Sequence, residues 1–97
     1  MLDTTSIYIK NKLEALGLSQ GLLIVFSGNR ISQARLAQAL SGGSPLRNED
    51  GLVFRRLLGE LDELAASSLT PVNWKETERI QEALRIRRDA RKVMEEV

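Results

Sequence analysis

The sequence predicts an all-α fold of five helices. Apolar residues recur at intervals of three and four in five separate stretches, the spacing that places them on one face of a helix. Residues that favour helix N-termini precede these stretches, and Gly or Pro residues separate them. The 97 residues suit one domain, whose core must be aliphatic because aromatic residues make up only 4%.

The first three predicted helices are short and lie at about 5–16, 20–27 and 32–40. Gly17 is a natural stop for the first, and Ser residues at the start of the second and third predict capped N-termini. The apolar run Leu22–Phe26 would also suit a buried strand. We assign it to a helix because a lone strand would have no partner.

The last two predicted helices are long. The fourth begins near residues 45–48 and ends at about Ser67, before the helix-breaking pair Thr70-Pro71. The fifth spans about 73–95, with an Asn73 cap and a Glu three residues later, a variant of the capping box. The expected apolar face of the fourth helix comprises Leu52, Val53, Phe54, Leu57, Leu58, Leu61 and Leu64.

The composition argues against an enzyme. The chain has no Cys and no His, which excludes disulfides, Cys/His zinc sites, thiol nucleophiles and the commonest general base. The pair Gly42-Gly43 lacks the Lys-Ser or Lys-Thr of a phosphate-binding loop. Carboxylates without a calcium-loop pattern are expected on exposed helix faces, at Glu60, Asp62, Glu63, Glu76 and Glu78. We expect no cofactor and no metal. These carboxylates are the only feature that would support an accessory role in a hydrolase, and we discount that role.

No apolar run approaches the roughly 20 residues of a membrane helix, and no signal-peptide pattern is present. We therefore expect a cytoplasmic protein. The net charge is +1, but its distribution is uneven. Seven basic and four acidic residues precede Gly59, whereas seven basic and nine acidic residues follow from there on. This asymmetry permits DNA contact, which requires local rather than overall positive charge.

Residues 18–42 predict a helix-turn-helix, in which Gly28 and Asn29 form the turn. Six residues supply its buried side: Leu22, Leu23, Phe26, Ile31, Leu36 and Leu40. The outward side of the second helix in this pair combines long polar with small residues: Gln33, Arg35 and Gln38 with Ala34 and Ala37. Gln can pair with adenine and Arg with guanine in the major groove.

This stretch resembles the Cro and lambda-type phage repressors, the XRE-like family. Leu18-Ser19-Gln20 opens one helix, Gly28 follows eight residues after Gln20, and Ile31-Ser32-Gln33 opens the next. Leu36 and a closing Gly42 complete the pattern, which covers about residues 13–61. The chain departs from it at Asn29-Arg30, a two-residue extension of the turn, and near Ile24, where the family usually has Ala.

The resemblance implies a transcriptional regulator, most simply a repressor, that binds a short operator in double-stranded DNA. By position, Gln33, Ala34 and Gln38 would face base edges, and Gln20 would contact a phosphate. Ser32, Arg30 and Arg35 would contact the DNA backbone, and Arg35 could also reach a base. A phage or mobile-element origin is what this family suggests.

We expect residues 1–70 to form the core and 71–97 a helix that packs on it within one compact domain. Trp74, Ile80 and Leu84 are expected to cover the fourth helix. A narrow apolar seam at coiled-coil spacing predicts a homodimer through Ala83, Ile86, Ala90, Val93 and Val97. Five basic residues lie among them: Arg85, Arg87, Arg88, Arg91 and Lys92. We expect them to interact with the negative C-terminal end of their own helix rather than with DNA phosphates.

The alternative is a protein-binding adaptor, an antitoxin-like or phage-encoded inhibitor that uses the helix-turn-helix scaffold for protein contacts. The low net charge favours this alternative. The Gln-rich third helix favours DNA.

Overall fold

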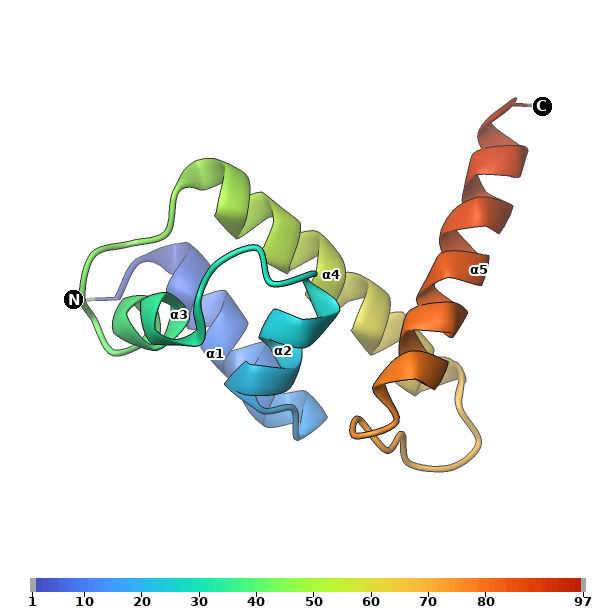
Figure 1. Cartoon of the computed structure of the whole chain (residues 1–97), viewed down its shortest axis with the longest axis horizontal. Helices are drawn as coiled ribbons and strands as arrows, with labels where there is room; N and C mark the ends of the chain where they lie inside the picture. The colour runs from blue at the N-terminus through green and yellow to red at the C-terminus, as the bar shows by residue number, and fades with distance from the viewer. Residues whose placement is uncertain (1, 97) are drawn as a thin grey trace.

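The computed structural model describes residues 2–96, and within them the chain forms five α-helices and no strand (Figure 1). The helices are α1 (Thr4–Leu16), α2 (Gln20–Phe26), α3 (Gln33–Leu40), α4 (Asn48–Ser67) and α5 (Thr77–Glu96). The predicted all-α fold is confirmed, including the helical state of the apolar run in α2. None of the described helices combines the length and apolar character that a membrane span requires.

Side-chain caps set the starts of the three short helices. The Asp3 carboxylate accepts a hydrogen bond from the backbone N–H of Ser6, at 3.3 Å. The Ser19 and Ser32 hydroxyl oxygens each accept one from the N–H three residues ahead, at 3.1 Å. These caps satisfy backbone donors that have no partner within their helix. Gly17 ends α1 in the left-handed conformation, at φ 66°.

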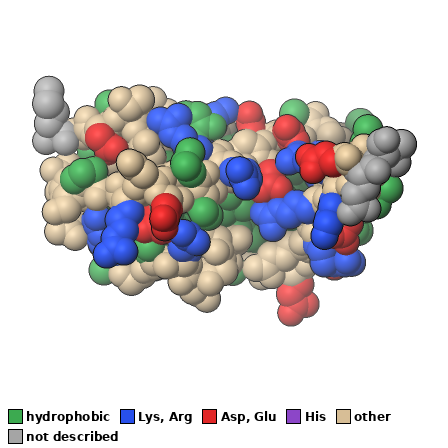
Figure 2. All heavy atoms as spheres, turned by 90° about the horizontal axis from the view of Figure 1, so that it is seen from above, with side chains coloured by type: hydrophobic (Ala, Val, Ile, Leu, Met, Phe, Trp, Pro, Cys, Tyr) green, Lys and Arg blue, Asp and Glu red, His purple; other side chains and the backbone are tan. Residues whose placement is uncertain are grey.

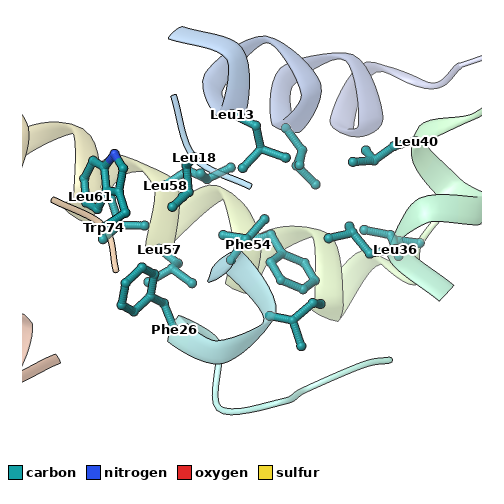
Figure 3. Close-up of a cluster of buried hydrophobic side chains, with 14 of the residues drawn as sticks. Leu13, Leu18, Phe26, Leu36, Leu40, Phe54, Leu57, Leu58, Leu61 and Trp74 are labelled. Carbon is teal, nitrogen blue, oxygen red and sulfur yellow. The ribbon is translucent and has the colours of Figure 1, made fainter. Parts of the chain in front are cut away.

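One hydrophobic core joins all five helices. Figure 3 shows side chains of α1, α2, α3 and α4 converging around Phe54, which has no exposed surface. Trp74, Ile80 and Leu84 belong to the same cluster. They do more than cover α4: the Trp74 ring meets Phe26 of α2 edge to face, with centroids 6.4 Å apart, and its Nε1 donates to the Leu16 carbonyl at 2.8 Å.

The expected start of the last helix was wrong by four residues. The Asn73 side chain accepts from the backbone N–H of Lys75 at 3.1 Å, and the Asn73 carbonyl accepts from Glu76 at 3.1 Å. These two bonds close a turn, and α5 begins only at Thr77. Asn side chains stabilise such turns as readily as they cap helices, so the sequence pattern is ambiguous.

Two residues of α4 lie on unexpected sides. Leu52 was expected in the apolar face, yet it is 66% exposed, because it projects from the side of the helix opposite Phe54. Glu60 was expected in solvent, yet it is only 7% exposed. It lies on the flank of α4 that turns toward α5, where Arg88 neutralises it.

Candidate nucleic-acid interface

A six-residue turn, residues 27–32, connects α2 to α3. Gly28 and Asn29 adopt the left-handed conformation, at φ 74° and 58°. The backbone N–H of Asn29 donates to the Ile24 carbonyl at 3.0 Å, and the Ser27 hydroxyl donates to the same oxygen at 2.7 Å. These bonds fold the extended turn back on the end of α2. Helix α3 begins thirteen residues after the start of α2, and the two helices remain in contact across this turn.

Helix α3 has a buried face and an exposed face. Leu36, Ala39 and Leu40 are buried in the core. The exposed face carries no charge and combines amide, methyl and hydroxyl groups: Gln33, Ala34, Ala37, Gln38 and, just after the helix, Ser41. Such a face can enter the major groove, since small residues allow close approach and amides can bond to base edges.

Glycine backbone lies against both glutamine side chains. A Cβ added at Gly21 of α2 would lie 3.4 Å from the Gln33 side-chain oxygen, so the Gln33 amide rests on α2. Gly43 lies over Gln38, whose carbonyl accepts from the Gly43 N–H at 2.9 Å. A Cβ at Gly43 would come within 2.7 Å of Gln38 Cγ. These contacts restrict the Gln33 amide and the first part of the Gln38 side chain.

The two arginines predicted to contact DNA are engaged within the protein. The Arg35 guanidinium donates to the carbonyls of Ser44 and Pro45, at 2.9 and 2.7 Å, and so anchors the α3–α4 loop. Arg30 Nε pairs with Asp50 Oδ1 at 2.7 Å. Both side chains therefore help to position α3, and Asp50 offsets the Arg30 charge.

Gln20 and Ser32 lie at the helix starts, as the sequence indicates. The Ser32 oxygen serves as the cap of α3. Gln20 opens α2 and lines a surface hollow of about 680 Å³ together with Ala37, Ser41 and Lys10. Lys10 and Ser41 were missed by sequence reasoning. Ser41 lies one helical turn after Ala37 and could have been found by extending that face, whereas Lys10 comes from α1 and only the fold brings it here.

The chain has no Asp or Glu between Glu14 and Glu49, a stretch that includes all of α2, the turn and α3. Its charged residues are Arg30, Arg35 and Arg47. A phosphate backbone approaching α3 therefore meets no carboxylate from this segment, although Glu14 of α1 lines the hollow beside Gln20.

The predicted dimer seam lies on the side of α5 away from its core contacts. Ile86 and Val93 are 55% and 61% exposed, although both are large and apolar. Ala90 is exposed and Ala83 is half-buried. Val97, the last residue assigned to the seam, lies outside the described residues.

Most of the arginines of α5 are paired with carboxylates. Arg88 makes a two-pronged bond to Glu60, with both N–O distances at 2.8 Å, and this hydrogen bonding raises the pKa of Arg88. Arg91 lies 3.7 Å from Glu63, while Asp62 pairs with Lys12 at 3.0 Å. The three neighbouring carboxylates of α4 (Glu60, Asp62 and Glu63) thus pair with three different cations.

Comparison of the chain with protein-family models, with curated proteins and with solved structures finds no match.

Proposed function

We propose that the protein is a sequence-specific DNA-binding regulator of transcription, similar to the Cro and lambda-type repressors, in which α3 reads the major groove. The observation that carries the proposal is the exposed face of α3. It presents amides and methyl groups without charge, within a segment that lacks carboxylates. This combination suits major-groove readout, because amides can bond to base edges and methyl groups can contact thymine methyls.

The roles follow from position on this face. Gln33 and Gln38 bond to base edges, and Ala34 meets a thymine methyl. Gln20 and Ser32, at the helix starts, contact phosphates. Arg30 and Arg35 lie near the DNA backbone and anchor the loops around α3, and Arg35 contributes the positive charge there, because Asp50 offsets that of Arg30.

We propose that the regulator acts as a homodimer, most simply as a repressor. A single short helix reads only a few base pairs, and a two-fold pair would read a palindrome. The exposed seam of Ala83, Ile86, Ala90 and Val93 is the subunit contact in this proposal. We also propose that the protein is cytoplasmic, because the phage-type repressors that it resembles bind DNA in the cytoplasm.

Selection from a randomised duplex pool tests the function. The purified protein is incubated with the pool, and the selected duplexes are titrated at two salt concentrations. The proposal predicts enrichment of a short palindrome whose affinity falls steeply as salt rises. A pool without enrichment would contradict it.

The protein-binding adaptor is the second candidate. It is favoured by the internal engagement of Arg30 and Arg35, which limits the positive charge available for phosphates. The same selection discriminates the two functions, since an adaptor enriches no duplex sequence.

A further inference from the structure

A groove of about 690 Å³ lies between α4 and the second half of α5, with the end of α2 at its base. Its apolar lining comes from Phe26, Leu52, Val53 and Leu57. Phe26 and Leu57 are nearly buried, whereas Leu52 remains 66% exposed. The groove therefore contains a large apolar side chain that the chain itself does not cover.

Basic residues surround this apolar lining. Figure 2 looks onto this side of the molecule and shows Lys and Arg side chains, with Asp and Glu among them, beside hydrophobic patches. Four cations line the groove, Arg56, Arg88, Arg91 and Lys92, against the carboxylates of Glu60 and Glu95. The excess of two positive charges attracts an acidic ligand.

The ion pairs leave part of this charge accessible. Arg88 uses Nε and Nη2 for Glu60, and its side chain is still 53% exposed. Arg91 makes only a long contact of 3.7 Å to Glu63. Arg56 is exposed and has no ion-pair partner among residues 2–96 whose side chains the structure describes. A carboxylate entering the groove therefore finds donors on both helices.

We propose that this groove binds an acidic amphipathic α-helix of a partner protein. Two diverging helices with an apolar lining and a polar rim accept the apolar face of a third helix. Leu52 and Val53 are the apolar anchors, and Arg56 and Lys92 receive the acidic residues beside the apolar face. The seam residues Ile86 and Val93 do not line the groove, so partner binding and dimer formation use different surfaces of α5. The proposal does not depend on DNA binding.

Selection of displayed peptides on the full-length protein tests it. The library carries random peptides of about 15 residues, the length at which isolated helices begin to be stable. We expect enrichment of peptides with apolar residues at helical spacing and an excess of Asp and Glu. Their affinity for the wild-type protein is then measured by fluorescence anisotropy, and it should fall as salt rises.

Matched variants locate the binding. Leu52→Ser and Arg56→Glu should each weaken the selected peptides about tenfold or more, the usual effect of losing an interface anchor. Leu69→Ser and Lys75→Glu serve as controls and should change affinity less than about twofold. Leu69 is fully exposed in the α4–α5 connection, and Lys75 lies outside the groove.

Five results would overturn the proposal. The pool fails to enrich, or its enriched peptides lack an acidic excess. The four variants bind the enriched peptides equally. Leu52→Ser halves the mass of the free protein, which makes the groove an interface between two copies. Arg56→Glu weakens duplex DNA but not the peptides, which assigns the groove to nucleic acid.

Discussion

Helices α3 and α5 expose surfaces of opposite composition. The outward face of α3 is uncharged, and its two glutamines rest against the backbone of Gly21 and Gly43. The exposed surface of α5 is densely charged, and many of its arginines are paired with carboxylates of α4 or of α5 itself. The glutamine side chains of α3 form no hydrogen bond within the described part of the protein, whereas most arginines of α5 have an ion-pair partner there.

Because of this difference, substitutions on the two helices should affect different properties of the protein. Substitutions on the outward face of α3 remove groups that make few contacts within the protein, so they should alter ligand affinity and leave folding intact. Substitutions on the α4-facing side of α5 break existing contacts and should alter folding. Substitutions in the apolar seam of α5 should leave folding intact and alter assembly, and with it the affinity for a palindromic duplex.

The largest expected effect comes from the seam. Ile86→Glu with Val93→Glu places charges in the proposed subunit contact and should yield a folded monomer. Its affinity for a palindromic duplex should fall about a hundredfold or more, because the second half-site no longer adds to binding. Sedimentation equilibrium measures the mass and anisotropy the affinity. Leu69→Glu is the control, and an unchanged mass in the double variant would refute the seam.

Next comes the contact between α4 and α5. Arg88→Ala leaves the Glu60 carboxylate without its partner in a part-buried position and should destabilise the protein by about 1–2 kcal/mol. Arg85→Ala removes only exposed pairs with Glu82 and Asp89 and should cost at most about 0.5 kcal/mol. Urea unfolding of both variants checks the contrast. Equal costs would mean that the buried pair does not hold α5 in place.

A pair of glycines tests the packing around α3. A Cβ at Gly43 would lie 2.8 Å from the Gln38 carbonyl oxygen, so Gly43→Ala should destabilise by about 1–3 kcal/mol. Gly59 lies inside α4 with no atom near the added Cβ, so Gly59→Ala should stabilise by about 0.5–1 kcal/mol. Thermal unfolding of the two variants should therefore shift in opposite directions. A stable Gly43→Ala protein would show that Gln38 is not constrained by the loop.

The smallest expected effect is a dependence on acid pH in both regions. The Ser6 hydrogen bond lowers the pKa of Asp3 below its usual value of 3.8, and the Arg85 hydrogen bond lowers that of Glu82 below 4.5. A depressed pKa in the folded state contributes stability above the unfolded value and loses it as pH falls through the folded value. Melting temperatures should thus decline below about pH 4.

Asp3→Asn and Glu82→Gln should each flatten that decline slightly, since both carboxylates are exposed and screened by solvent. Asp3→Asn reports on the α1 cap and Glu82→Gln on the surface of α5. Profiles identical to the wild type would show that neither hydrogen bond is retained in solution.

Local patterns predicted most of the helices, and long-range contacts account for the errors. The caps at Ser19 and Ser32 could be predicted because each cap is adjacent in sequence to the helix that it begins. The burial of Glu60 could not be predicted, because its partner Arg88 lies 28 residues away on another helix. The same limit applies to Arg35, whose predicted contact with DNA took no account of the loop carbonyls that hold it.

The candidate site shows the same division. The outward positions of Gln33, Ala34 and Gln38 followed from helical spacing, and the structure places all three at the surface. Lys10 joins the hollow beside Gln20 only because α1 packs against α3, which spacing within one helix cannot reveal.

The most direct test of the central claim measures base discrimination by α3. Gln33→Ala and Gln38→Ala are compared with Gln81→Ala, an exposed glutamine on α5, for binding to the duplex selected by the wild type. We expect each α3 variant to lose about 1–3 kcal/mol of preference for that duplex over a scrambled one, with unchanged unfolding. Gln81→Ala should behave as the wild type. Full sequence preference in both α3 variants would contradict the assignment of this helix to DNA.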